Sequence, residues 1–143
     1  MISIAKDFAW EMGHRLPNHP GQCKNPHGHS YKMRLILNGT TNQNGMIIDY
    51  NEVNKIVENV IEKYNHAFVV NKNDNTMWDF LEENEFKYIV IPFDSTAENL
   101  TELFAAELIS AFNKFNNIHE IKIRIQETKD VYAEKIINLK SLN

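Results

Sequence analysis

The sequence predicts an α+β domain in which an antiparallel sheet of four strands carries two helices on one face. Two segments, 31–37 and 121–126, alternate apolar and polar residues with a period of two, which is typical of strands with one buried face. Two other segments, after Asp49 and Ser95, place apolar residues at helical spacing. Further strands at both ends of the chain give the order β-β-α-α-β-β. Because strands and helices are grouped rather than alternating, the order favours an α+β fold.

The first two strands are expected before residue 38. Residues 2–10 are apolar and aromatic and predict the first strand. In the second strand, one face consists of Tyr31, Met33, Leu35 and Leu37. Residues 38–45 are rich in Asn, Gly and Thr, and this composition predicts a turn.

Capping patterns predict where both helices begin. Asp49 is followed three residues later by Glu52, and Ser95 by Glu98, which is the spacing of a capping box. The apolar face of the first helix would consist of Val53, Ile56, Val57, Val60, Ile61 and Tyr64. That of the second would consist of Leu100, Leu103, Phe104, Leu108, Phe112 and Phe115.

The remaining segments give weaker patterns. Residues 65–87 are polar and mixed, with a short helix expected around 77–84, and residues 88–92 form a short apolar stretch. Residues 121–126 and 132–140 predict the last two strands. We therefore expect one face of the sheet to lie on the helices and the other to be solvated or buried in an oligomer.

Composition narrows the class of protein. A length of 143 residues with 43% hydrophobic and 24% charged residues predicts one globular domain, 1–143, able to bury a core. A net charge of −4 gives no indication of a nucleic-acid partner, and no apolar run reaches the ~18 residues of a membrane span. A single cysteine and no apolar leader fit a reducing, cytoplasmic location.

The chemistry is concentrated between His14 and His29. His27 and His29 are separated by one glycine, so on a strand both side chains point to the same face. With His14 from a neighbouring strand they would form a three-histidine site with an open position, as in catalytic zinc centres. Imidazole ligands favour zinc, although iron or nickel would also fit, and the spacing leaves His19 open as a ligand.

Other side chains are less distinctive when taken alone. Cys23 lies in a loop flanked by Gly and Pro rather than in an apolar run, and beside a cation such a thiol would be a reactive group. His66 would be a histidine at the end of a helix. Glu127 would be a solvated carboxylate at a strand end, and Glu98 half of a capping box.

Taken together, the motifs resemble the 6-pyruvoyltetrahydropterin synthase / 6-carboxytetrahydropterin synthase family over nearly the whole chain. They are His14-Arg15-Leu16-Pro17, Cys23-x-x-x-His27-Gly28-His29-Ser30-Tyr31, Gly45-Met46-Ile47-Ile48-Asp49-Tyr50, Asn65-His66, Ser95-Thr96-Ala97-Glu98-Asn99-Leu100 and Glu127-Thr128. The resemblance implies the tunnelling fold, with subunits joined through their sheets into homo-oligomers, usually trimers stacked into hexamers. It places active sites between subunits.

The resemblance also implies roles for individual residues. His14, His27 and His29 would hold Zn²⁺, which would stabilise the charge that forms when a carbon-bound proton leaves. Cys23 would be the catalytic thiol and His66 its acid/base partner. The pterin would be anchored by a two-point contact with Glu127. Thr96 and Glu98 would line the pocket.

One position departs from the family pattern. The residue before the catalytic histidine is usually Asp, and here it is Asn65. An amide orients an imidazole but does not stabilise its protonated form as a carboxylate does, and the corresponding change in a serine-protease triad costs about 10⁴ in rate. We expect Asn65 to support reduced activity.

The Cys-x-x-x-His-Gly-His spacing resembles the bacterial 6-carboxytetrahydropterin synthases of queuosine biosynthesis. The expected substrate is 7,8-dihydroneopterin triphosphate, and the products are 6-carboxy-5,6,7,8-tetrahydropterin, acetaldehyde and triphosphate. Formation of 6-pyruvoyltetrahydropterin from the same substrate is an alternative, as is a weakly active or non-catalytic pterin- and zinc-binding protein. The triphosphate could be held by Lys24, Lys32, Arg34 or side chains of a second subunit.

Overall fold

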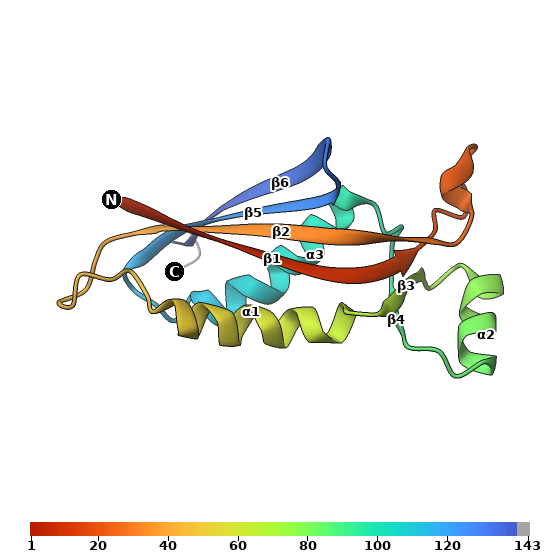
Figure 1. Cartoon of the computed structure of the whole chain (residues 1–143), viewed down its shortest axis with the longest axis horizontal. Helices are drawn as coiled ribbons and strands as arrows, with labels where there is room; N and C mark the ends of the chain where they lie inside the picture. The colour runs from red at the N-terminus through yellow and green to blue at the C-terminus, as the bar shows by residue number, and fades with distance from the viewer. Residues whose placement is uncertain (140–143) are drawn as a thin grey trace.

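The computed structural model describes residues 1–139, which form one sheet with helices on one of its faces (Figure 1). The strands are β1 Ile2–His14, β2 His27–Gly39, β3 Ala67–Asn71, β4 Tyr88–Ile91, β5 Ile118–Thr128 and β6 Val131–Asn138. The helices are α1 Tyr50–Tyr64, α2 Asn75–Glu83 and α3 Ala97–Phe112, with a 3₁₀ turn, η1, at Gln22–Lys24. Residue 140, with which the predicted last strand ends, lies outside the described residues.

The α+β class is confirmed, but the predicted sheet was incomplete. The described strands form a mixed six-stranded sheet in the order β4-β3-β1-β2-β5-β6. The four predicted strands, β1, β2, β5 and β6, are antiparallel neighbours, whereas β3 pairs parallel to β1 and β4 pairs parallel to β3. The sequence prediction missed β3 and gave β4 only as an apolar stretch. These strands have five and four residues, too few for a clear period of two.

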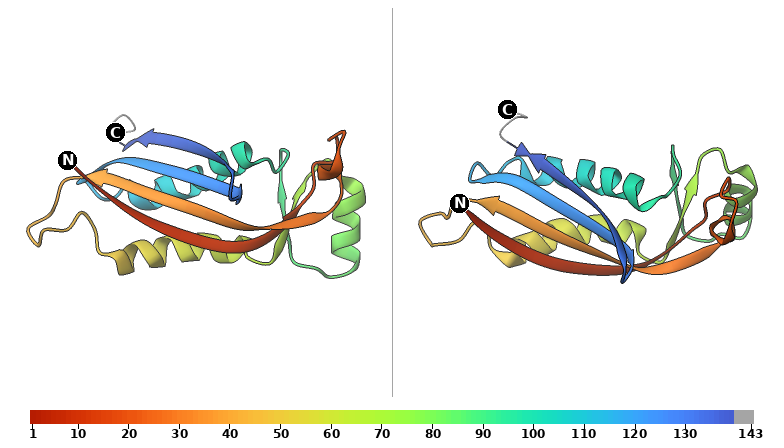
Figure 2. Two further views of the ribbon diagram at one scale, coloured as in Figure 1. Left: turned by 45° about the horizontal axis from the view of Figure 1, so that its top comes forward. Right: turned by 90° about the horizontal axis from the view of Figure 1, so that it is seen from above.

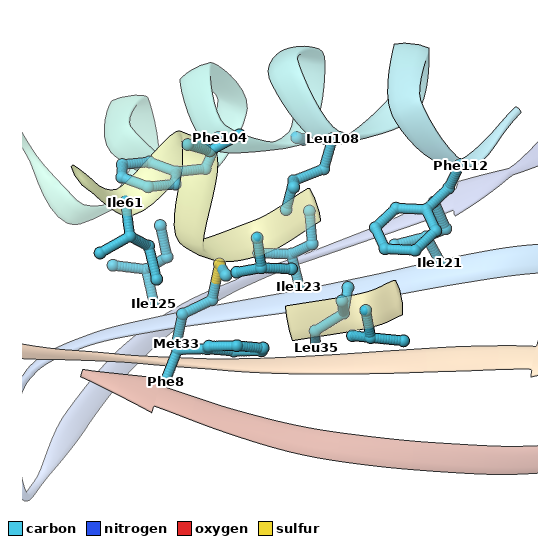
Figure 3. Packing of buried hydrophobic residues seen from close by; sticks show 14 of the residues in the cluster. Phe8, Met33, Leu35, Ile61, Phe104, Leu108, Phe112, Ile121, Ile123 and Ile125 are labelled. Carbon is cyan, nitrogen blue, oxygen red and sulfur yellow. The ribbon is translucent and has the colours of Figure 1, made fainter. Parts of the chain in front are cut away.

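Helices α1 and α3 cover the same face of the sheet, as the views in Figures 1 and 2 show. The alternating positions of the strands and the apolar sides of both helices form the core between them (Figure 3). Trp10 lies against Tyr31 and Phe104, with ring centroids 5.6 Å and 5.1 Å away. No described helix is long and apolar enough to cross a membrane.

The helix starts follow local hydrogen bonding. The Asp49 carboxylate accepts from the Asn51 N–H at 2.7 Å and caps α1, as predicted. The predicted cap of α3 was wrong by one residue, because Thr96 accepts from the Asn99 N–H at 3.1 Å. Ser95 is instead buried against His14. The third helix, α2, begins at Asn75 behind its cap Asp74, two residues before the predicted start.

The other face of the sheet carries charged pairs together with exposed apolar side chains such as Ile136. The Arg34 guanidinium donates two hydrogen bonds to the Asp7 carboxylate, at 2.7 Å and 2.9 Å. The Glu134 carboxylate forms ion pairs with Lys122 and Arg124, and the N–O distance is 3.0 Å in each. Residues of this face alternate along β1, β2, β5 and β6 with the buried ones, so each of these four strands has a helix-facing side and an outward-facing side.

Candidate active site

The β1–β2 ladder brings three histidines together at one end of the sheet. His14 pairs directly with His27, and His29 pairs with Met12. The three histidines occupy the same alternating strand positions as the core residues. Their side chains therefore lie on the helix-facing side of the sheet, next to the core. Each offers a nitrogen within 4.8 Å of the others. Both strands are longer than predicted, which places all three histidines on regular β-structure.

Two facing glycines allow the strands to pass close to a third strand at this point. Gly13 and Gly28 are cross-strand partners. A Cβ atom at Gly13 would lie 3.0 Å from the Phe68 ring, and one at Gly28 would lie 3.2 Å from the Met12 carbonyl oxygen. Side chains at these positions would push against β3 and against β1 itself. Gly28, between the two histidines, therefore allows the close pairing of β1 with β2 that places His27 and His29 beside His14.

His14 is held in one orientation from its Nδ1 side. This nitrogen lies 2.9 Å from the Ser95 carbonyl oxygen, so Nδ1–H donates to it. The opposite nitrogen, Nε2, is buried and has no hydrogen-bond partner among the described residues. Burial is the main cause that lowers the pKa of His14 to about 4, so the ring is neutral at pH 7. A neutral imidazole with an unused, fixed Nε2 lone pair is suited to hold a metal ion.

The other two histidines complete the donor set. The Nδ1 atom of His27 lies 2.7 Å from the Asn25 carbonyl oxygen, which leaves its Nε2 free in the same way. Burial lowers the pKa of His29, and the neighbouring His27 lowers it further. Three clustered imidazole ligands fit Zn²⁺ with an open position. His19, the other histidine of this loop, is outside the cluster and accepts from the Gly21 N–H at 2.9 Å.

The histidines open into a cavity of about 400 Å³. The predicted residues Cys23, Thr96, Glu98 and Glu127 line it together with the three histidines. They come from η1, from the start of α3 and from the end of β5. The sequence prediction missed the other lining residues, which are Leu16, Ala97, Thr128, Val131, Tyr132 and Ala133. Val131, Tyr132 and Ala133 follow the β5–β6 turn. In the sequence, they could have been found only because they lie close to the Glu127-Thr128 motif.

Glu127 is the more buried of the two carboxylates that line this cavity. Burial is the main cause that raises its pKa; Glu98 raises it further, while His27 and Tyr31 lower it. Its Oε2 atom lies 4.0 Å from His29 Nε2. Tyr31, which the sequence indicated only as a core residue, is fully buried beside Glu127 and the histidines. Glu127 can thus accept hydrogen bonds from a ligand in a site partly shielded from water.

Asn65 and His66 do not line this cavity. His66 borders a second, largely apolar cavity of about 360 Å³ with Glu11, Gly13 and Phe68. Glu11 and Gly13 alternate along β1 with Met12 and His14, so the second cavity lies on the opposite side of the strand. Within one chain, the structure does not bring His66 and Cys23 together.

Asn65 is nevertheless placed to orient His66. The Asn65 side-chain oxygen accepts from the Glu11 N–H at 3.1 Å and lies 3.0 Å from His66 Nδ1. Because an amide oxygen only accepts, Nδ1 carries the proton and Nε2 is left as the basic nitrogen. His66 has a φ of 61°, and its N–H donates to the Glu11 carbonyl oxygen at 2.7 Å. The side chain is therefore fixed by both the backbone and its neighbour.

Comparison with known proteins identifies the family. The sequence model of 6-pyruvoyl tetrahydropterin synthase matches residues 3–135. The chain belongs to this family. It is a family of pterin synthase lyases. The chain is 30% identical over 145 residues to the 6-carboxy-5,6,7,8-tetrahydropterin synthase of Haemophilus influenzae, covering 94% of this chain and 98% of that protein.

A further relative and a solved structure are also similar to this chain over nearly its whole length. The enzyme of the same name from Rickettsia conorii is 24% identical over 137 residues, covering 94% of this chain and 99% of the relative. The structure of the Plasmodium falciparum 6-pyruvoyl tetrahydropterin synthase superposes with a TM-score of 0.77 at 21% identity, covering 96% of this chain and 98% of that one. This last similarity shows that the pterin synthase fold is shared.

Proposed function

We propose that the protein is a zinc-dependent 6-carboxy-5,6,7,8-tetrahydropterin synthase. It would convert 7,8-dihydroneopterin triphosphate to the 6-carboxy product, acetaldehyde and triphosphate, as a cytoplasmic step of queuosine biosynthesis. One observation carries the proposal: three clustered histidines, one thiol and two carboxylates line the same cavity. Family membership and the names of the relatives support this reaction class.

Glu127, Cys23 and the three histidines each have a task in this reaction. Glu127 accepts hydrogen bonds from the pterin ring N–H and amino group, which fixes the ring while its side chain extends toward the histidines. Cys23, as a thiolate, takes a proton from a side-chain carbon. Zn²⁺ held by His14, His27 and His29 would supply stabilisation of negative charge on the side-chain oxygens. Thr96 and Glu98 border the same space at the start of α3.

The second acid/base comes from another copy of the chain in this proposal. Cys23 and His66 lie in separate cavities on opposite sides of β1, so one substrate meets both only across a subunit contact. His66, with the proton on Nδ1, accepts or returns a proton at Nε2. The protein would therefore act as a homo-oligomer, a trimer or a dimer of trimers.

The deciding experiment is mass spectrometry of the products formed from 7,8-dihydroneopterin triphosphate by the zinc-loaded protein. A 6-carboxy product with acetaldehyde supports the proposal. A 6-pyruvoyl product would replace it with the alternative synthase reaction. Absence of any product, with zinc and pterin still bound, would favour a binding protein and would attribute the loss to Asn65.

The shared site has its own test. The variants Cys23→Ala and His66→Ala are each expected to be inactive alone. Mixed under conditions that exchange subunits, they should recover about a quarter of the sites, because each site draws the two residues from different copies. Mixtures that stay inactive, although mass spectrometry shows mixed oligomers, would place both residues in one subunit.

A further inference from the structure

Arg15 joins the loop that carries Cys23 to the start of helix α2. Its Nε donates to Asp74 Oδ2 at 2.7 Å, and its Nη2 donates to Asp74 Oδ1 at 2.5 Å. From the same guanidinium, Nη1 donates to the Lys24 carbonyl oxygen at 3.4 Å. The side chain of Asp74 is only 3% exposed and that of Arg15 is 22% exposed. The Arg15 guanidinium thus links the buried Asp74 carboxylate to the carbonyl group of Lys24, the residue that follows Cys23.

Both ends of this link are fixed by further hydrogen bonds. Asp74 caps α2 by accepting from the Met77 N–H at 3.3 Å, and its own N–H donates to the Asn71 carbonyl oxygen at 2.8 Å. On the loop, the Leu16 N–H donates to the Cys23 carbonyl oxygen at 2.8 Å. The loop and α2 lie together at the end of the molecule away from the chain termini (Figure 1).

The turn that carries Cys23 is held by hydrogen bonds rather than by buried side chains. Among the described residues, η1 contains no buried side chain. Cys23 is exposed, although it borders the cavity of the three histidines. The position of the thiol therefore depends on the hydrogen bonds of the neighbouring backbone, and Arg15 supplies one that connects this backbone to Asp74 at the start of α2.

We propose that Arg15, anchored by Asp74, is a positioning residue that holds the Cys23 turn against the candidate active site. This inference rests on the proposed function, in which Cys23 is the reacting thiol. The guanidinium fork is needed because it bonds two carboxylate oxygens and a carbonyl in one plane, which a lysine ammonium does not reproduce. A misplacement of about 1 Å at a reacting group costs up to about a hundredfold in rate.

The test compares Arg15→Lys and Asp74→Asn with Asp49→Asn. Asp74→Asn leaves an oxygen that can cap α2 but removes the charge that binds Arg15. Asp49→Asn is the matched control, because Asp49 caps α1 in the same way without contacting a guanidinium. Steady-state kinetics, zinc content and amide hydrogen exchange at Leu16 and Asn25 are measured well below the lowest melting temperature.

The expected result is a fall in kcat of about tenfold or more in Arg15→Lys and Asp74→Asn, with KM and zinc content within about twofold of the parent. Exchange at Leu16 and Asn25 should be faster in these two variants and unchanged in Asp49→Asn. An unchanged kcat in Arg15→Lys, with only a lower melting temperature, would overturn the proposal and leave the ion pair a purely stabilising role.

Failure of the proposed function would be recognised separately, because the parent protein would then form no product. Hydrogen exchange does not depend on turnover and still decides whether Arg15 holds the turn. Faster exchange confined to Arg15→Lys and Asp74→Asn would support the positioning role. Equal exchange in all four proteins would overturn it.

Discussion

His14 and Ser95 are joined across 81 residues of sequence, with His14 Nδ1 2.9 Å from the Ser95 carbonyl oxygen and 3.1 Å from its hydroxyl. This contact attaches the end of β1 to the residue just before the cap of α3. It fixes the tautomer of a buried imidazole and leaves Nε2 pointing away from the contact. Burial of the same ring, which the Ser95 hydrogen bond only partly offsets, makes the site sensitive to acid.

The zinc-free protein should lose stability between pH 7 and pH 5. His14 has a pKa of about 4 when folded, against an ordinary value of 6.5, so the unfolded chain binds more protons in this interval. The contribution is complete above pH 6.5 and is lost as the pH falls toward 4. We expect about 2 kcal/mol less unfolding free energy at pH 5 than at pH 7. Denaturant unfolding of chelated protein measures it, and equal values at both pH values would contradict it.

Asn65→Asp should raise turnover. A carboxylate at residue 65 can accept the same two hydrogen bonds, from Glu11 N–H and His66 Nδ1–H, and in addition stabilises the imidazolium that forms when His66 takes a proton. We expect kcat to rise by about tenfold or more. The measurement is single-substrate kinetics of parent and variant at equal zinc content. A variant that is no faster would show that His66 does not need this stabilisation.

Removing the thiol and removing a ligand should have different effects. Cys23→Ala is expected to abolish product formation while zinc and pterin remain bound, because the three imidazoles stay intact. His29→Ala should lower the zinc content as well as the activity. Metal analysis of both purified variants distinguishes them. Zinc loss in Cys23→Ala would make the thiol a metal ligand instead.

Glu127→Gln should weaken substrate binding more than Glu98→Gln. A charged acceptor in a hydrogen bond is worth about 1.5–3 kcal/mol, so KM should rise roughly tenfold to a hundredfold. Glu98 lies at the start of α3 in the same cavity and serves as the comparison. Equal increases in KM for the two variants would mean that Glu127 does not anchor the pterin.

The elements with strong periodicity were predictable and the short ones were not. The alternation of Ile121, Ile123 and Ile125 gave β5, and capping by Asp49 gave α1. Strand β3 depends on tertiary pairing, since it meets β1 only at Met12–His14. The cap of α3 moved from Ser95 to Thr96 because His14 binds Ser95, a contact that local sequence does not reveal.

For the candidate site, spacing predicted the histidine cluster and the family resemblance implied the other residues, but neither gave the side of the sheet on which His66 lies. The His-Gly-His pattern predicted His27 and His29 on one face with His14 from a neighbouring strand, and the pairing of β1 with β2 brings the three together. His66 follows a helix and takes a positive φ, so no periodicity fixes where it points. The role of Arg15 was also hidden, because its partner Asp74 lies 59 residues away.

The pairing of β3 with β1 covers only Met12–His14, so in the described chain residues 2–10 of β1 have no strand neighbour on that side. Strand β6 forms the opposite edge of the sheet, and the three antiparallel pairings between them make β1 and β6 run in opposite directions. A second copy could therefore add its β1 beside β6 with ordinary antiparallel geometry, and each addition would present the same edge again. Such growth ends in a closed ring if the curvature of the sheet matches and in an open fibre if it does not. Substitutions that flatten the sheet would then favour the open fibre over the closed ring without altering any residue of the candidate site.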